Sequence, residues 1–451
     1  MADAELPAAV VAAINGMWIF VAGIICFLLQ AGFGLLEAGA VRAKNAQNIM
    51  IKNLLDACVA ALSYWLVGYG FAYGDNGNSF IGSGYYVFSE DDYIGWFFQY
   101  VFAGTTATIV SGAVAERCQF QAYLVYSCAL TAFIYPVVSH WIWHPDGFLF
   151  GNVYDYAGGG AVHGVGGVAA LCGAFFLGPR IGRFVKNEET GKWESHPIPG
   201  HNLVLSALGA FILWFGFFAF NGASGYDIAT PEGYITTGRV AVVTTLAGST
   251  GALTILGLYR FKDGTWDMMQ AMNGLLAGMI TTCSGVAAYE PWAAIIVGCT
   301  GALAYYVQEW VTINVCRIDD PLSAAALHMG SGFWGTFIVA FLAKPEFAGE
   351  EFKGIFYGGG IDRLGWQLAA IAVYATWAAG TSSVMFFTLK SLNMLRVDEA
   401  TEKMGLDLHH HGGVAYRIPS MEVKNLPHQA LDVSDTVPAE KVAEKEEAAD
   451  E

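Results

Sequence analysis

The chain has 451 residues, of which 55 % are hydrophobic and only 14 % are charged. Because soluble proteins carry about 25 % charged residues, this composition excludes an ordinary soluble protein and indicates a chain that crosses a membrane several times. The formal net charge is −17, and residues 397–451 carry thirteen acidic against five basic side chains, which argues against nucleic acid or an anionic membrane surface as a partner of this segment.

Apolar runs of about 20 residues predict an all-α membrane protein with about eleven transmembrane helices. The predicted spans are 13–38, 50–73, 95–115, 121–141, 158–178, 201–224, 238–258, 266–284, 290–314, 323–343 and 365–393. Residues 1–396 therefore form the predicted membrane domain. Residues 397–451 form a tail that we expect to be ordered to about residue 416 and, because it then becomes acidic and poor in aromatic residues, disordered beyond it.

The loops between these spans alternate in positive charge. Loops on one side of the membrane carry thirteen lysine and arginine residues, and loops on the other side carry four. Because lysine and arginine concentrate in cytoplasmic loops, we expect the N-terminus to be extracellular and the tail to be cytosolic.

Aromatic and hydroxyl side chains lie at the extracellular ends of three predicted spans. Phe102 lies a few residues into the third span, Trp143 follows the fourth, and Phe220 and Ser224 lie near the end of the sixth. Each aromatic residue alone fits ordinary packing, and Trp143 also fits the belt of interfacial tryptophans. Together they fit a site in which π-faces attract a small cation and the Ser224 hydroxyl accepts a hydrogen bond from it.

Two histidines lie inside predicted spans at related positions. In "DYAGGGAVHGVGG" His163 follows Asp155 by eight residues, and in "DDPLSAAALHMGSGFWG" His328 follows Asp320 by eight; a glycine follows each histidine by four. These segments belong to the fifth and the tenth spans, one in each half of a five-plus-five arrangement. Because each half has an odd number of spans, the pattern predicts an inverted repeat, as many transporters have.

The depth of the two histidines follows from helix geometry. Eight helical residues rise about 12 Å, and half of the hydrocarbon core measures about 15 Å. Counted inward from opposite faces, both histidines reach the middle of the membrane, where an ionisable side chain is costly without a partner or a function. We expect His163 and His328 to pair within a pore; two separately buried histidines and a bis-histidine haem site are the alternatives.

Several other residues are assigned neither to the outer cation site nor to the histidine pair. Glu37, Asp56 and Glu309 lie toward the cytosolic side, where such residues cap helices or meet basic loops, and "LHHHGG" in the tail indicates a turn or a docking feature. The eight cysteines include no CxxC pair, so we expect neither structural disulfides nor a zinc site.

Six motifs in this chain resemble those of one family. The segments "AGAVRAKNAQNIM", "SGAVAERCQF", "DYAGGGAVHGVGG", "WFGFFAFNGAS", "DDPLSAAALHMGSGFWG" and "GLDLHHHGGVAY" occur in the order found in ammonium transporters of the Amt/Mep/Rh superfamily. The resemblance covers the chain to about Tyr416. It is to the Amt branch, especially the plant-type group, because Trp143 and Ser224 are both present.

The resemblance implies the ammonium transporter fold, a homotrimer in the plasma membrane and one pore in each subunit. The residues that match the family's site residues are Phe102, Trp143 and Ser224 for an external ammonium site, Phe102 and Phe220 for a gate below it, His163 and His328 for the pore, and Asp155 as a support that does not touch substrate.

The implied activity is transmembrane transport of ammonium or ammonia rather than an enzymatic reaction, and no cofactor or metal is implied. An electroneutral ammonia gas channel and an ammonium sensor acting through the tail are the alternatives, and a cytosolic regulator at the tail is a possible partner. Plant-type members often carry a phosphorylatable threonine where this chain has His409, so regulation by that modification is not expected at this position.

Overall fold

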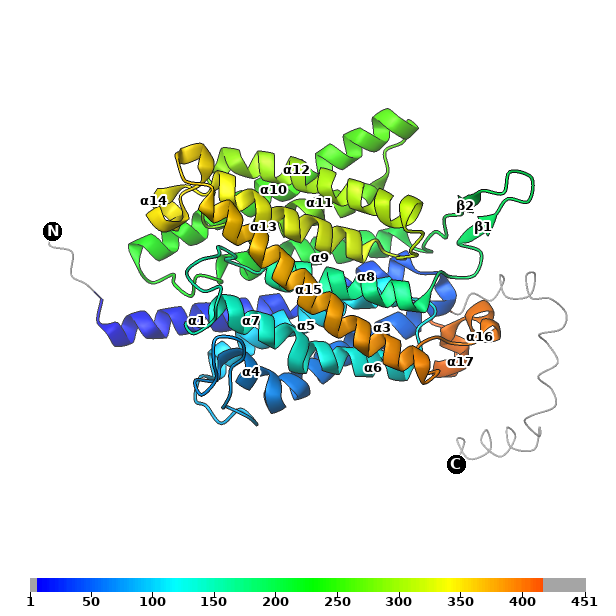
Figure 1. Cartoon of the computed structure of the whole chain (residues 1–451), viewed down its shortest axis with the longest axis horizontal. Helices are drawn as coiled ribbons and strands as arrows, with labels where there is room; N and C mark the ends of the chain where they lie inside the picture. Colours follow the sequence, from blue (N-terminus) through cyan, green and yellow to red (C-terminus); the bar gives the residue numbers. More distant parts are fainter. Residues whose placement is uncertain (1–5, 417–451) are drawn as a thin grey trace, which may run out of the picture.

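The computed structural model describes residues 6–416, and the statements on the fold refer to this part of the chain. Helices run side by side along the long axis of the molecule (Figure 1). One end carries α4 and α14, and the opposite end carries the β1–β2 hairpin with α16 and α17 (Figure 1). The disorder expected for the end of the tail concerns residues 417–451, which lie outside the described residues.

Eleven helical segments occupy the eleven predicted spans. The first five are α1 (Ala8–Phe27) with α2 (Leu29–Ala40), α3 (Ala46–Ser63) with α4 (Tyr69–Tyr73), α5 (Tyr93–Val114), α6 (Phe120–Ala129) with α7 (Tyr135–Trp143), and α8 (Val165–Leu177). The next five are α9 (Leu203–Gly222), α10 (Pro231–Asp263), α11 (Met268–Cys283), α12 (Pro291–Trp310) and α13 (Ser331–Leu342), and the last is α15 (Asp362–Ser391).

π-Helical and short elements complete the described chain. The π-helical turns are η2 (Tyr64–Gly68), η3 (Leu130–Ile134), η4 (Gly159–Gly164), η5 (Val311–Val315) and η6 (Ala326–Gly330). The 3₁₀ turns are η1 (Ala43–Asn45), η7 (Glu350–Phe352) and η8 (Ile355–Tyr357), the strands are β1 (Phe184–Lys186) and β2 (Trp193–Ser195), and the short helices are α14 (Pro345–Ala348), α16 (Glu399–Met404) and α17 (Leu406–His411).

The prediction of an all-α membrane fold is confirmed. Eight helices of the described chain are long and apolar enough to cross a membrane, and a shorter apolar helix covers Ala326–Leu342. The two remaining predicted spans are α11 and α12. The only strands within residues 6–416 are β1 and β2, which form one antiparallel hairpin.

Local capping explains where several helices begin. The side chains of Asp92, Asn202, Thr230 and Asp267 each accept a hydrogen bond from a backbone N–H three residues later, which satisfies a donor that the first helical turn leaves free. Because Thr230 caps it and Gly264 ends it in a left-handed conformation, α10 is longer than the predicted 238–258. The fourth span is also longer than predicted, so Trp143 is the last residue of α7 and does not follow the span.

The two halves of the fold enter the membrane through matching structures. Asp155 Oδ2 accepts hydrogen bonds from Gly160 N at 3.0 Å and Ala161 N at 2.9 Å, and Asp320 Oδ2 accepts one from Ala325 N at 2.6 Å. In both halves the carboxylate precedes a π-helical turn, η4 or η6, that contains the histidine. The spacing that suggested a repeat in the sequence therefore reflects the same local structure in each half.

The glycines after the histidines allow the two halves to touch. A Cβ atom at Gly167 would lie 2.2 Å from Met329 N, and one at Gly332 would lie 2.3 Å from Gly159 O and 2.9 Å from Gly164 N. Each glycine therefore packs against the histidine-bearing turn of the other half, and a side chain at either position would separate the turns.

Candidate functional site

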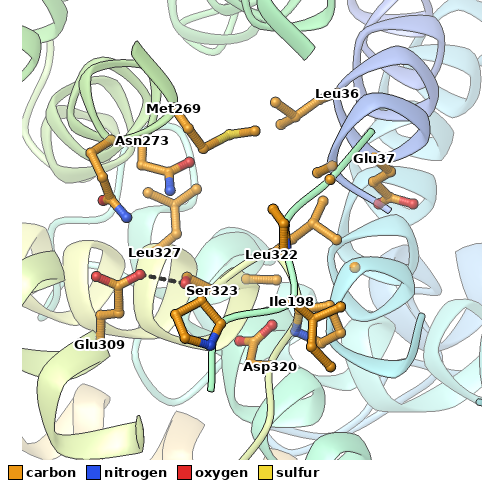
Figure 2. Close-up of a pocket in the computed structure, with 18 of the residues that line it drawn as sticks. Leu36, Glu37, Ile198, Met269, Asn273, Glu309, Asp320, Leu322, Ser323 and Leu327 are labelled. Atoms are coloured by element: carbon orange, nitrogen blue, oxygen red, sulfur yellow. Dashed lines mark hydrogen bonds between the residues drawn. The ribbon is translucent and has the colours of Figure 1, made fainter. Parts of the chain in front are cut away.

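Two cavities lie at opposite ends of α5. The first, here called the Trp143 cavity, measures about 390 Å³ and is lined by Tyr69, Tyr73, Asp92, Gly95, Phe98, Gln99, Phe102, Trp143, Tyr156, Ser224 and Tyr226. The second, here called the Glu37 cavity, measures about 340 Å³ and is lined by Glu37, labelled in Figure 2, among others. His328 also lines it. α5 contributes its first turns to the Trp143 cavity and Ile109 and Gly112 to the Glu37 cavity.

The Trp143 cavity brings together the three residues expected at an external site. Trp143 Nε1 donates a hydrogen bond to the Asp155 carbonyl oxygen at 2.9 Å, which fixes the indole. Its ring meets that of Phe102 edge to face, with centroids 6.3 Å apart. The Ser224 hydroxyl donates to the Phe220 carbonyl oxygen at 2.7 Å, so its lone pairs remain available as acceptors on the cavity side.

A stacked pair of phenylalanines closes this cavity toward the middle of the fold. The rings of Phe102 and Phe220 lie 4.1 Å apart at an interplanar angle of 18°. Both side chains are buried, with exposed fractions of 2 % and 1 %. The expected role of these two rings as a gate stays a prediction.

The two histidines meet directly below the stacked rings. His163 Nδ1 and His328 Nδ1 are 3.1 Å apart and share a hydrogen bond, which requires that one imidazole donates and the other accepts. The His163 ring also stacks on Phe217 at 5.6 Å and contacts Phe220 at 5.5 Å. His163 is fully buried, and its Nε2 has no hydrogen-bond partner among the described residues.

This geometry does not fit the haem alternative. Two imidazole nitrogens that ligate one metal from opposite sides each lie about 2.0–2.1 Å from it, so they are about 4 Å apart. Here the facing nitrogens are 3.1 Å apart, and their rings stack at 20°. No group of three or more His, Cys, Asp or Glu side chains within residues 6–416 is arranged to hold a metal ion.

The comparison with known proteins identifies the fold family. The model of the Ammonium Transporter Family matches residues 17–416. The chain belongs to the ammonium transporter family. This family membership supports ammonium transport by a membrane protein with several transmembrane helices.

Relatives and solved structures agree with this assignment. The chain is 42 % identical to ammonium transporter 3 of Dictyostelium discoideum over 88 % of its own length and 93 % of that protein, and 42 % identical to ammonium transporter 1 member 2 of Arabidopsis thaliana over 84 % and 79 %. A solved structure described as a sensor Amt protein aligns with a TM-score of 0.83 and 30 % identity over 90 % of this chain and all of that chain. Candida albicans Mep2 aligns with a TM-score of 0.75 and 26 % identity over 86 % of each chain.

Asp155 supports this transporter's Trp143 cavity from behind. Its side chain accepts the two backbone hydrogen bonds at the start of η4, and its own carbonyl oxygen holds Trp143. Burial raises the pKa of Asp155 to about 6, against the hydrogen bonds that favour its charged form. The residue does not line the cavity, and its expected role as a support without substrate contact stays a prediction.

The sequence interpretation missed part of the lining of the Trp143 cavity. Tyr69, Tyr73, Asp92 and Tyr226 all face it, and Gln99 Nε2 donates to the Tyr226 hydroxyl at 2.6 Å. The four-residue spacing of the two tyrosines in the second span and the capping position of the aspartate before the third were visible in the sequence. Tyr226 lies in a turn after α9 with a φ of 58°, and neither its spacing nor a capping position in the sequence indicated that it lines the cavity.

The tail packs against the same end of the bundle as the Glu37 cavity. Asp407 accepts hydrogen bonds from Gln47 N at 3.0 Å and Asn48 N at 2.7 Å, which caps α3. Asn48 Nδ2 lies 2.9 Å from His411 Nε2, and Glu402 accepts one hydrogen bond from Ile181 N at 2.8 Å. The predicted docking feature around "LHHHGG" is therefore α17, which contacts its own chain.

Two arginines of the loop after the fifth span are not available as basic partners for a neighbouring tail. Arg180 and Arg183 are both buried and paired with Asp319, at 2.8 Å and 3.3 Å. Arg180 also contacts Glu116 at 3.3 Å, and Glu116 binds Arg42 at 2.7 Å. Buried arginines require such pairing, so these side chains fasten loops of one chain together.

Glu37 and Asp56 also differ from the expectation that they cap helices or meet basic loops. Both are buried within helices, with exposed fractions of 2 % and 0 %. Glu37 accepts hydrogen bonds from Asn53 and Ser111, and Asp56 accepts one from the Tyr123 hydroxyl.

Proposed function

We propose that the chain captures ammonium in the Trp143 cavity, removes a proton from it and passes ammonia along the two histidines to the Glu37 cavity. The observation that carries this proposal is the bonded pair of His163 and His328 between two cavities, below a stack of two phenylalanines. We further propose that the N-terminus is extracellular, the tail is cytosolic and the protein is a homotrimer in the plasma membrane.

The chemistry of the Trp143 cavity suits ammonium. Potassium has a similar size and the same charge, so charge alone does not separate the two ions. Aromatic faces attract either cation, but only ammonium donates hydrogen bonds. The Ser224 oxygen keeps lone pairs on the cavity side and can accept a hydrogen bond from ammonium but not from potassium.

The barrier below the cavity separates ammonia from ions. The stacked rings of Phe102 and Phe220 offer a bare cation no replacement for its hydration shell, and such a transfer is costly. Transfer of neutral ammonia from water into this apolar passage costs much less free energy than transfer of a cation. Because potassium has no proton to lose, a passage that requires deprotonation excludes it.

The paired imidazoles supply the polar step in this apolar passage. Each ring has one nitrogen in the shared hydrogen bond, and an imidazole both accepts and donates protons near physiological pH. When a proton arrives at Nε2 of the donor ring, that ring can give its Nδ1 proton across the shared hydrogen bond to the other ring, which then releases its own Nε2 proton, so one proton passes along the pair and no imidazolate forms. The pair also offers ammonia a hydrogen-bond partner where the surrounding side chains are apolar.

The experiment that tests the proposal compares His163→Ala and His328→Ala with His201→Ala. His201 is a partly buried histidine whose ring bonds the Val41 carbonyl oxygen and lies in neither cavity. In proteoliposomes, both pore variants are expected either to lose ammonium flux or to admit potassium, whereas the control keeps wild-type flux and selectivity. Wild-type flux and selectivity in both folded pore variants would overturn the proposal.

The alternatives are separated by measurements on the wild-type protein. Ammonium-driven uptake without current would favour the electroneutral gas channel. Absence of uptake in a stable, folded protein would favour a sensor; a solved relative in the same fold is described as a sensor Amt protein. Light scattering of the detergent-solubilised protein tests the proposed trimer.

A further inference from the structure

The Glu37 cavity contains a carboxylate that the proposed transport pathway does not use. Glu37, labelled in Figure 2, lies on α2 and is 2 % exposed. It lines the same cavity as His328. Phe33, one helical turn before it, packs against the His328 ring with centroids 6.1 Å apart. Since one turn rises about 5.4 Å, Glu37 comes one step after the histidine on the way out of the pore.

The hydrogen bonds of Glu37 leave half of its carboxylate free. Asn53 Nδ2 and Ser111 Oγ both donate to Oε2 at 2.7 Å. No hydrogen bond to Oε1 is formed by any residue of the described chain 6–416, and Oε1 is not among the fully buried polar atoms without a partner. One oxygen therefore anchors the side chain to α3 and α5, and the other faces the cavity.

The charged groups around Glu37 come from several elements. On α3 the ammonium group of Lys52 lies over the Tyr123 ring at 5.0 Å and has no hydrogen-bond partner among the described residues, and Asp56 lies one turn further. Besides Glu37, the charged or titratable groups that line the cavity itself are Arg180, Arg183, Tyr259, Glu309, Asp320 and His328.

A free oxygen alone does not single out Glu37 among the acidic groups of the cavity. Glu309 also binds through one oxygen, since its Oε1 accepts hydrogen bonds from Tyr305 at 3.0 Å and Ser323 at 2.6 Å, the second drawn in Figure 2. Asp320 Oδ2 accepts the backbone bond that begins the tenth span, and its Oδ1 is fully buried. Arg180 and Arg183 are paired with Asp319. Glu37 is distinguished by Phe33, one helical turn before it, which contacts the His328 ring, and it keeps an oxygen free for exchange.

We propose that Glu37 exchanges the transported proton with ammonia at the exit of the pore, an inference that rests on the proposed function. For inward transport, the carboxylate first accepts the proton that ammonium released and that reaches the cavity through His163 and His328. The protonated carboxyl group then gives this proton to ammonia, so that Glu37–COOH and NH₃ become Glu37–COO⁻ and NH₄⁺. The carboxylate is regenerated, and one proton has moved for each ammonia.

The cavity has room for this exchange. A water molecule occupies about 30 Å³ in the liquid, so a volume of about 340 Å³ admits ammonia together with several waters. These can connect the imidazole of His328 to the carboxylate without direct contact between the two side chains.

A structural role for Glu37 predicts a different result from a proton-exchange role. Glutamine has the same shape, and its carbonyl oxygen accepts hydrogen bonds from Asn53 and Ser111 as well as a carboxylate oxygen does. It cannot accept and release the proton. Glu37→Gln therefore keeps the hydrogen bonds to Asn53 and Ser111 and removes the proton exchange.

The test records ammonium-driven currents and luminal pH in proteoliposomes containing the full chain. Glu37→Gln is expected to reduce the current at least tenfold, in keeping with the roughly 10²–10⁴-fold effect of general acid–base groups. Glu309→Gln changes another carboxylate of the same cavity and keeps a carbonyl oxygen that accepts the hydrogen bonds of Tyr305 and Ser323, so its current is expected to stay within about twofold of wild type. A Glu37→Gln current within about twofold of wild type would overturn the inference.

A second pair of variants covers the case in which Glu37→Gln does not give a stable protein. Glu37→Asp and Glu37→Asn have the same size and differ only in the ionisable group, so a current at least tenfold larger in Glu37→Asp supports the inference and equal currents overturn it. Wild-type uptake without current would overturn the inference while leaving transport intact. Absence of any wild-type ammonium flux would instead overturn the proposed function.

Discussion

Replacement of Trp143 by leucine tests whether an aromatic face captures the cation. The indole is held in place by its hydrogen bond to the Asp155 carbonyl oxygen at 2.9 Å and by edge-to-face contact with Phe102. Leucine fills part of the same volume but has no π-face. The Phe102–Phe220 stack lies below the indole and stays intact, so the change acts on capture and not on the passage.

The expected magnitude follows from the position of the ring. A cation–π contact contributes about 0.5–1 kcal/mol at an exposed site and about 2 kcal/mol where the cation is desolvated. Trp143 is partly buried at a cavity wall, so we expect a loss of about 1–2 kcal/mol. Because about 1.4 kcal/mol corresponds to a tenfold change in affinity, the half-saturating ammonium concentration should rise about 5- to 30-fold.

The assay is the dependence of ammonium-driven current on external ammonium concentration in proteoliposomes. Trp143→Phe serves as the matched control because it keeps a π-face. It loses the five-membered ring of the indole and the hydrogen bond to Asp155, which contributes about 0.5–1.5 kcal/mol. The phenylalanine variant should lie between wild type and Trp143→Leu. An unchanged half-saturation in a folded Trp143→Leu protein would refute the reasoning, and equal shifts in both variants would show that packing, not the π-face, is responsible.

Three further predictions concern the contact between the halves, the buried ion pair and the tail. Gly167→Ala should reduce transport severalfold or more, because its Cβ would lie 2.2 Å from Met329 N and push the histidine turns apart, a strain of about 1–3 kcal/mol. Asp319→Asn should destabilise the protein by about 3–5 kcal/mol, as loss of one partner of a buried ion pair does. Burial alone would raise the pKa of Asp319, but the hydrogen bonds and charge of Arg180, with Arg117 nearby, hold this pKa well below its usual range. The charged carboxylate therefore stabilises the fold above about pH 4, this contribution is lost as the pH falls below that value, and the variant should lower the apparent unfolding temperature more at pH 7 than at pH 3. Deletion from Val397 should impair transport, because it removes the Asp407 cap of α3, whereas deletion after Leu426 should leave transport nearly intact.

Each of these predictions has a control in the same chain. Gly238→Ala, where an added Cβ meets nothing within 4 Å, should transport like wild type; equal effects of the two glycine changes would contradict the contact argument. Asp362→Asn changes an exposed ion pair, which contributes about 0–1 kcal/mol, and a drop in unfolding temperature as large as that of Asp319→Asn would contradict the buried-pair argument. The two tail deletions need equal surface expression and intact oligomers, and equal transport by both would remove the tail from the mechanism.

Much of the fold could be predicted because it depends on local sequence. Bilayer thickness sets the length of an apolar run, and the capping residues at helix starts are also local. The relation between Asp155 and His163, repeated in Asp320 and His328, is a matter of spacing along one helix. The same spacing indicated the expected depth of the two histidines, whereas the external-site residues were assigned from the resemblance to the family.

The pairing of His163 with His328 was expected from their spacing, and that of Phe102 with Phe220 from the family resemblance, but the sequence did not give the contacts themselves. The distance of 3.1 Å between the imidazole nitrogens, the stacking of the two phenylalanine rings and the free oxygen of Glu37 each depend on how distant helices rotate and pack against one another. Apolar helices expose similar surfaces on several sides, so composition does not determine how each helix is rotated. Close contacts between small residues and a neighbouring helix determine the rotation, such as the contact of Gly167 with Met329. The sequence also did not indicate the ion pairs of the loops. Arg180 is one of several basic loop residues in the sequence, and only the tertiary structure brings Asp319 and Glu116 to it. This pairing is needed because a buried charge must be neutralised.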